Sequence, residues 1–362
     1  MASGAGAASN PRPIPWSALA EIRHKIQQRK AGQAAFEAAH GKSRPIITLE
    51  AFDNRFTAVG NEIHFSPIET TKYFPDFLTR YVKRVLTQTW GNAEIAKPLP
   101  ERHQILKWYE SVCHYERRQK RDADGAYRRV PSGAMLSWYR FAYDLYLIKH
   151  NAKLQKRILD RIRSKDHFQG ARFELCVTAA MVVAGFQIDF EDETDTSRKH
   201  PEFIAKHPSG ISVAVEAKSR HRHGVLGFEL PGGTVTDKVA VEGLLRNALA
   251  KDCNVPYFIF IDVNVPPTTE VAEGNPWFKE MSDTVKNLYQ EWDNGTFPAN
   301  AVYFCSDPSH YVPDEVLKGP PFWCYEMPIK EPRYLLPDPE LSMRVAQALI
   351  QRTNIPNEFP SW

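Results

Sequence analysis

The sequence has few cysteines and no long apolar run, and both shortages narrow the class of protein. Its five cysteines are widely spaced and form no CxxC pair. An odd number of separated cysteines predicts reduced thiols and argues against a disulfide framework. No uninterrupted apolar run approaches the roughly eighteen residues that a membrane helix needs. We therefore expect no membrane partner.

Several catalytic signatures are also missing. The chain has no GxxxxGK phosphate loop, no HExxH, no GxSxG, no cysteine–histidine zinc spacing and no internal repeat. The sequence therefore gives no support for an ATP-driven protein, a serine hydrolase or a zincin. The formal net charge is only +3, which by itself does not indicate nucleic-acid binding.

Length and composition predict an organisation into two parts. With 362 residues, 43% hydrophobic and 12% aromatic, the chain is long enough for two packed domains. Residues 1–15 are rich in Ala, Gly, Ser and Pro and lack the pattern of a signal peptide, so we expect a disordered tail and a cytoplasmic protein. Residues 16–166 read as a mainly helical domain and residues 167–362 as an α/β domain with a C-terminal extension.

In the N-terminal part the pattern predicts helices over 70–89, 100–119 and 132–164, and a small hairpin within 55–65. Basic residues gather near 117–129 and again along 153–165. Such runs are usually solvated helix faces, although contact with phosphate is another use. This region is a candidate for nucleic-acid binding or substrate specificity.

The most informative letters lie between 200 and 218. His200 to Lys206 and Ile211 to Lys218 read as short strands, and His207-Pro208-Ser209-Gly210 between them is turn chemistry. With Gly210 left-handed, the register pairs Ile204 with Ala214 and Glu202 with Glu216. Lys218 follows two residues after Glu216 and shares its face.

This hairpin gathers two carboxylates and one amine. Like charges that face each other across a ladder are destabilising, so the Glu202 and Glu216 pair needs a compensating cation. Lys218 or a hard divalent ion such as Mg²⁺ can provide it.

The neighbouring elements follow a definite order. A helix is predicted over 168–184, a strand over 186–190, the hairpin, a helix over 237–251 and a buried strand over 256–263. The order is αβββαβ. Beyond it we expect a helix near 277–292, a strand at 299–305 that extends the sheet, and a closing helix over 338–353.

Pro201-Glu202, then Glu216-Ala217-Lys218, with Glu174 on the preceding helix, resemble the signature of the PD-(D/E)XK nuclease superfamily. The resemblance covers roughly residues 168–265. It departs at Glu202, where the family most often has Asp.

The resemblance implies a restriction-endonuclease-like core, a mixed sheet flanked by helices, and a metal-dependent endonuclease acting on DNA. It implies that Glu202, Glu216 and, through water, Glu174 hold Mg²⁺ or Mn²⁺. Lys218 would then position or deprotonate the attacking water, or neutralise the developing charge.

Further residues are candidates for contact with nucleic acid. Arg220 and Arg222 leave the predicted strand at the rim of the site, where they would hold flanking phosphates. Asn247, on the next helix, occupies a position where relatives place a polar side chain that orients the phosphate. The acidic run Glu191, Asp192, Glu193 and Asp195 reads as a solvated loop or as a substitute source of a ligand for Glu202.

Two other functions stay open. The departure at Glu202 fits a nucleic-acid-binding module that keeps the nuclease fold without turnover. An interaction protein whose N-terminal helices do the work is the third reading. The sequence leaves open duplex or branched DNA against RNA, the pathway, and whether the chain forms a homodimer.

Overall fold

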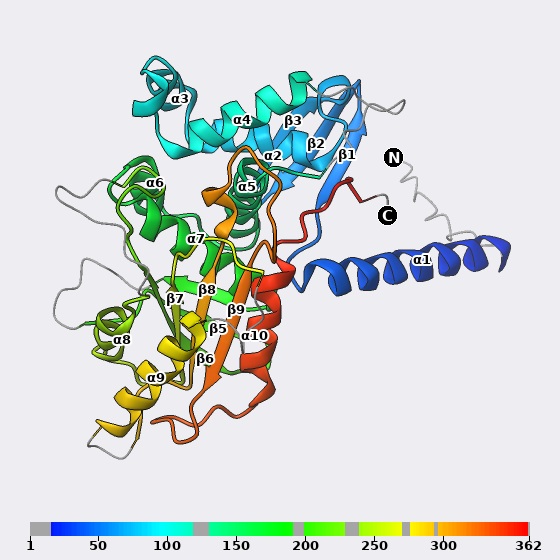
Figure 1. The fold of residues 1–362 in the computed structure, drawn as a ribbon. Helices are drawn as coiled ribbons and strands as arrows, with labels where there is room; N and C mark the ends of the chain where they lie inside the picture. Colours follow the sequence, from blue (N-terminus) through cyan, green and yellow to red (C-terminus); the bar gives the residue numbers. More distant parts are fainter. Residues whose placement is uncertain are drawn as a thin grey trace, which may run out of the picture.

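The computed structural model describes residues 16–118, 130–190, 199–228, 239–269, 276–292 and 296–360. These residues form a mixed α/β fold with a six-stranded sheet and a three-stranded sheet (Figure 1). None of the described helices is both long and apolar enough to cross a membrane.

The N-terminal part combines helices with the smaller sheet. Its helices are α1 (Trp16–His40), α2 (Phe74–Val85), α3 (Gln88–Ile95), α4 (Gln104–Arg118), α5 (Gly133–Asn151) and α6 (Lys156–Arg163). Its strands are β1 (Ile47–Ala51), β2 (Asn54–Val59) and β3 (Glu62–Pro67), all antiparallel. The hairpin expected within 55–65 is confirmed as β2 and β3. The third strand, β1, was not predicted.

The helix expected over 132–164 is two helices, α5 and α6, because the first helix ends at Asn151. The side-chain oxygen of Asn151 accepts a hydrogen bond from the backbone N–H of Arg44 at 2.7 Å, and its amide donates to the carbonyl of Leu147 at 2.7 Å. An asparagine that bonds to nearby backbone competes with helix continuation. The expectation of one continuous helix was therefore wrong.

The second part begins with α7 (Phe168–Val183), and the predicted order αβββαβ is confirmed. It continues with β4 (Gln187–Phe190), β5 (Phe203–Lys206), β6 (Ser212–Ser219), α8 (Glu242–Leu249) and β7 (Tyr257–Asp262). Beyond these lie α9 (Pro276–Gln290), β8 (Ala301–Ser306), β9 (Trp323–Pro328) and α10 (Glu340–Gln351). The strand expected at 299–305 does extend the sheet, as β8.

The large sheet has the order β4-β5-β6-β7-β8-β9. Strands β6, β7 and β8 are parallel, and the remaining neighbours are antiparallel. Alternate residues of each strand point to opposite faces. Val213 and Val215 of β6 pack with α7 and α10 on one face, whereas Ala214 packs with α8 and α9 on the other.

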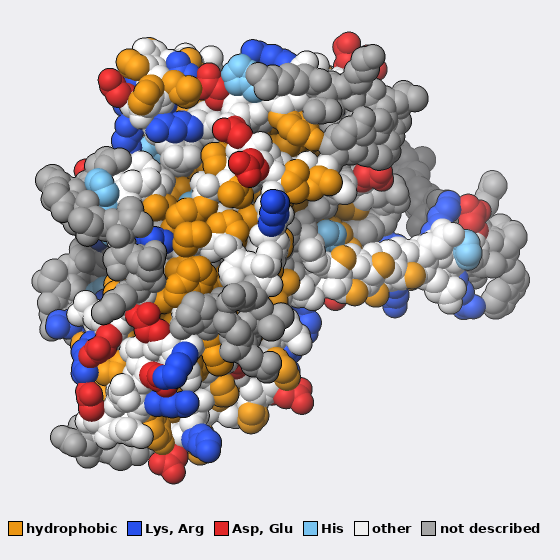
Figure 2. Space-filling view, in the orientation of Figure 1, with side chains coloured by type: hydrophobic (Ala, Val, Ile, Leu, Met, Phe, Trp, Pro, Cys, Tyr) orange, Lys and Arg blue, Asp and Glu red, His pale blue; other side chains and the backbone are white. Residues whose placement is uncertain are grey.

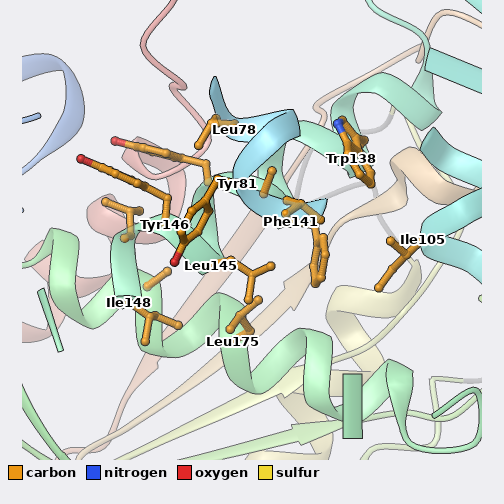
Figure 3. Close-up of a cluster of buried hydrophobic side chains, with 14 of the residues drawn as sticks. Leu78, Tyr81, Ile105, Trp138, Phe141, Leu145, Tyr146, Ile148 and Leu175 are labelled. Carbon is orange, nitrogen blue, oxygen red and sulfur yellow. The ribbon is translucent and has the colours of Figure 1, made fainter. Parts of the chain in front are cut away.

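A third cluster of buried side chains joins the two parts. It contains Leu78 and Tyr81 of α2, Leu145 and Tyr146 of α5, and Leu175 of α7 (Figure 3). Because α7 belongs to the second part, residues 16–166 and 167–362 share one core.

Helix α1 differs from the other helices because it stands clear of the body (Figure 2). Only Gly32, Phe36 and His40 are half-buried among its described side chains. These three residues recur every fourth position and therefore line one side of the helix, where it meets the end of the chain. The His40 ring nitrogen Nδ1 lies 2.6 Å from the carbonyl of Asn354.

Candidate functional site

The site is built on the hairpin of β5 and β6, and its register is the one predicted from the sequence. Ile204 pairs with Ala214. The His207 N–H donates to the Ile211 carbonyl at 2.8 Å, and Gly210 has φ of 87°, the left-handed conformation that glycine adopts freely. The N–H of Glu202, directly before β5, donates to the Val215 carbonyl at 3.0 Å. This bond holds Glu202 beside Glu216.

The three predicted side chains come together on the sheet face that α8 covers. Lys218 Nζ lies 2.5 Å from Glu216 Oε1 and 3.6 Å from Glu202 Oε1. The Glu216 side chain is fully buried, whereas those of Glu202 and Lys218 are 18% and 25% exposed. The cluster therefore has a buried carboxylate at its base and a carboxylate and an amine that reach solvent.

Burial makes Glu216 an unusual acid. It raises the pKa of the Glu216 carboxyl, and the neighbouring Glu202 raises it further, while Lys218 and Lys251 act in the opposite direction. Its second oxygen, Oε2, is buried and has no hydrogen-bond partner within the described part of the chain. A buried carboxylate oxygen without a partner is costly in a folded protein, so the site favours a group that can satisfy it.

Lys218 keeps its proton. Burial alone would lower the pKa of its amine, but the carboxylates of Glu216 and Glu202 outweigh this effect and hold the pKa above its usual value. The group at the centre of the site is therefore an ammonium ion at neutral pH. It can neutralise negative charge and donate hydrogen bonds.

A second amine in the site was missed by the sequence analysis. Lys251, two residues after the end of α8, places its Nζ 3.4 Å from Glu216 Oε1. The Glu280 carboxylate of α9 helps to set this geometry, because it accepts hydrogen bonds from the N–H groups of Val239 at 3.1 Å and Ala240 at 2.9 Å, just before α8. The available signal was the position of Lys251, one helical turn beyond Asn247.

The carboxylates suit a hard divalent cation. Such an ion takes oxygen ligands and commonly uses one or two protein carboxylates with waters and phosphate oxygens. The unsatisfied Glu216 Oε2 and the solvent-reaching Glu202 match this donor set. Within the described ranges, no group of three or more His, Cys, Asp or Glu side chains could hold a metal ion. The protein would therefore supply two carboxylates and leave the other positions to water or substrate.

Glu174 belongs to helix α7, and its carboxylate forms an ion pair with Arg161 Nη1 of α6. Helix α7 packs on the sheet face opposite to the one that bears Glu216. The role of Glu174 as a ligand through water stays a prediction.

The three predicted phosphate-binding residues have different environments. Arg220 and Arg222 were expected at an open rim, but each residue is only 7% exposed. Arg222 Nη1 donates to the Asn264 carbonyl at 3.2 Å and to the Tyr311 hydroxyl at 3.0 Å, so it links two loops of the protein. Asn247 is exposed on α8. Their contact with nucleic acid stays a prediction, and the acidic run at 191–195 lies outside the described residues.

Next to the site, the ends of β6 and β7 hold a buried polar pair that was also not predicted. Asp262 Oδ2 accepts hydrogen bonds from Arg172 Nη2 of α7 and from Ser219 Oγ, both at 3.0 Å. Burial raises the pKa of Asp262, and the Arg172 guanidinium acts to lower it. The pair fixes α7 against the sheet end and belongs to the scaffold of the site.

Comparison of the chain with family models, with curated proteins and with solved structures gave no match. Any functional conclusion therefore depends on the residues of the site.

Proposed function

We propose that the protein is a metal-dependent nuclease that hydrolyses phosphodiester bonds, with DNA as its substrate and with a restriction-endonuclease-like core. The observation that carries the proposal is the convergence of Glu202, Glu216 and Lys218 on one sheet face, with an unsatisfied carboxylate oxygen at the base. The order from α7 through β7 supports the fold assignment.

In this proposal Glu216 and Glu202 hold Mg²⁺ or Mn²⁺. When bound, the ion lowers the pKa of water and stabilises negative charge on the reacting phosphate. Lys218, which is protonated, neutralises charge on a phosphate oxygen and orients the attacking water through its N–H groups. Lys251 supplies a second positive charge at the base. Water attacks phosphorus and releases a proton to the solvent, the ester P–O bond breaks, and the leaving oxygen takes up a proton from the solvent.

A specific observation also supports the second candidate, a nucleic-acid-binding module without turnover. The Lys218 ammonium lies within ion-pair distance of both carboxylates, so their charge is compensated without a metal. In this case the site would be a fixed part of the fold, and the protein would bind nucleic acid without cutting it.

The test is cleavage of supercoiled plasmid, linear duplex, single-stranded DNA and RNA by purified protein, with Mg²⁺, Mn²⁺ or EDTA. Glu216→Ala and Lys218→Ala should each lower the cleavage rate by about 10²–10³, the usual effect of losing one charge-stabilising group. Glu340→Ala changes a carboxylate that is 79% exposed on α10 and serves as the control, with the parental rate expected.

Calorimetric titration with Mn²⁺ separates the two candidates. The nuclease should bind the ion, Glu216→Ala should lose this binding, and Lys218→Ala should keep it. Folded variants of Glu216 and Lys218 that cut at the parental rate would place the active site elsewhere. Wild-type protein that binds DNA, but does not bind Mn²⁺ and cleaves none of the substrates, would support the binding module.

A further inference from the structure

In the three-stranded sheet of the N-terminal part, the face that points to solvent carries apolar side chains, and the face that points inward carries mainly polar ones. One face presents Ile47 and Leu49 of β1, Phe56 and Ala58 of β2, and Ile63 and Phe65 of β3, which the register places in two cross-strand rows. We call these six residues the apolar sheet face. Four of them are large and well exposed, namely Ile47 at 57%, Leu49 at 66%, Ile63 at 70% and Phe65 at 65%.

The opposite face of the same sheet is largely buried and mainly polar, although Val59 on it is apolar and fully buried. Arg55, Thr57, His64 and Ser66 are all less than a tenth exposed. Arg55 Nη1 donates to the Lys72 carbonyl at 3.1 Å, and its guanidinium stacks 4.0 Å above the Phe359 ring. These contacts fix which face points inward, because a slip of one residue in register would exchange the two faces.

His64 makes the inner face equally specific. Its Nδ1 lies 2.8 Å from Arg84 Nη1 of α2, and its ring packs edge-on against Tyr81 at 5.4 Å. Burial and the Arg84 guanidinium both lower the pKa of His64, which leaves a neutral ring able to accept this hydrogen bond. Arg55 and His64 thus have partners on the inner face, and the apolar sheet face points outward.

The patch is large for a monomer surface. Phe52, at the β1–β2 turn, adds a side chain that is 92% exposed. At about 200 Å² for a large side chain, these five exposed residues offer on the order of 600 Å² of apolar area. Contiguous apolar patches of this size mark interaction sites, and a standard interface buries about 800 Å² per partner.

We propose that a second copy of this chain covers the apolar sheet face, with the two sheets packed face to face around a two-fold axis. Its six residues carry no charge and no side-chain hydrogen-bonding group, so the face can meet an identical face without unsatisfied polar atoms. Sheets with apolar faces pack in this way about 10 Å apart.

The charges at the edge of the patch are compatible with self-association. The Glu50 carboxylate pairs with Arg55 Nη2, and Glu62 Oε1 lies 2.7 Å from Lys149 Nζ. Both acidic side chains are therefore neutralised within their own chain. An identical copy meets little electrostatic repulsion at this surface.

Helix α1 lies directly before this sheet in the chain. It ends at His40, seven residues before β1 begins, and its described side chains between residues 21 and 31 are all exposed. A helix gains most of its stability from packing, and a helix without packing is marginal in water. A second copy seated on the adjacent sheet gives the projecting part of α1 a surface to pack against (Figure 1).

The experiment measures the mass of the full-length protein by light scattering and sedimentation over a wide range of concentration. We expect a dimer for the wild type. The double variant Leu49→Asp with Phe65→Asp should weaken association at least about 30-fold, the effect of losing one hot-spot side chain. Both side chains are at least 65% exposed, so the fold should survive, which circular dichroism can check. Leu335→Asp, at an apolar residue that is 82% exposed elsewhere, is the matched control and should remain dimeric.

A cysteine pair gives an independent measurement that does not introduce charge. Phe65→Cys should form a disulfide between two chains on mild oxidation, whereas Leu335→Cys should behave like the wild type. A wild type that is monomeric at every concentration overturns the proposal, including the case in which another segment of the same chain covers the face. A dimer that survives both aspartates and gives no crosslink at Phe65→Cys overturns it as well.

Discussion

The free energy of unfolding should depend on pH because of Glu216. Its pKa is raised in the folded protein, chiefly by burial and then by Glu202, so the folded state holds a proton that the unfolded state releases near pH 4.5. Stability should therefore fall as the pH rises above this value. Glu216→Gln mimics the protonated acid, with Lys218 still charged beside it.

We expect Glu216→Gln to match the wild type below about pH 4 and to become increasingly more stable above it. Urea unfolding at a series of pH values measures this difference. A variant that loses stability relative to the wild type as the pH rises would show that the ion pair with Lys218 outweighs the burial of Glu216.

Lys251 gives the second prediction at this scale. Its amine lies 3.4 Å from Glu216 Oε1, whereas the Arg246 side chain of α8 is 50% exposed. Lys251→Ala should lower any cleavage activity by about tenfold or more and raise the pKa of Glu216, because a positive charge is lost. Arg246→Ala, which removes an exposed cation, is the matched control and should have a much smaller effect. Equal losses from both changes would place nucleic acid along α8 and leave the base of the site unexplained.

Only some of the residues in this site could be predicted from the sequence, for physical reasons. Glu202, Glu216 and Lys218 belong to one hairpin, and a hairpin has a period of two and a register set by its turn. Lys251 reaches its carboxylate partner, Glu216, from outside this hairpin. Such tertiary partners depend on the packing of helices on a sheet, which local patterns do not encode.

At the scale of elements, the segment after β6 behaves as a buried connector. Arg222 bonds to Asn264 and Tyr311, and the Gln169 side chain of α7 donates to the Arg222 carbonyl at 3.1 Å. Arg222→Ala would remove these two hydrogen bonds of a buried guanidinium, and a hydrogen bond to a charged group contributes about 1.5–3 kcal/mol. We expect a lower melting temperature.

The measurement is thermal unfolding by calorimetry, with DNA binding assayed only at temperatures at which the variant is folded. Lys279→Ala is the control, because the Lys279 side chain is 83% exposed on α9. Its melting temperature should equal that of the wild type. A variant of Arg222 with unchanged melting and weakened, less salt-dependent DNA binding would restore the original assignment of this arginine to phosphate contact.

Elements with strong periodicity were predicted well. Helix α7, the β5–β6 hairpin and the buried strand β7 follow the patterns of their apolar residues. Strand β1 and the inward orientation of Arg55 and His64 were missed. A prediction that places apolar residues inside assigns this small sheet the wrong way round, since Arg55 contacts Phe359 and His64 contacts Arg84 of α2 on its inner face.

At the scale of the whole molecule, the segment after α10 packs against the N-terminal part. Ile355 and Phe359 pack against the cluster that contains α2 and α5, and the N–H of Phe74 donates to the Asn357 carbonyl at 3.1 Å. A bidentate pair anchors the preceding residue Arg352, whose Nη1 lies 2.9 Å from both carboxylate oxygens of Asp144. The domain boundary predicted at residue 166 divides a single hydrophobic core, to which residues before and after the boundary contribute.

This closure of the chain on itself has a consequence for biosynthesis. The helices and the small sheet leave the ribosome before Phe359, whose ring covers Arg55, and before Arg352, which pairs with Asp144. The early segment therefore has an incomplete core, with Arg55 uncovered, until residues 352–359 have emerged. A nascent chain arrested before residue 352 should still be held by chaperones.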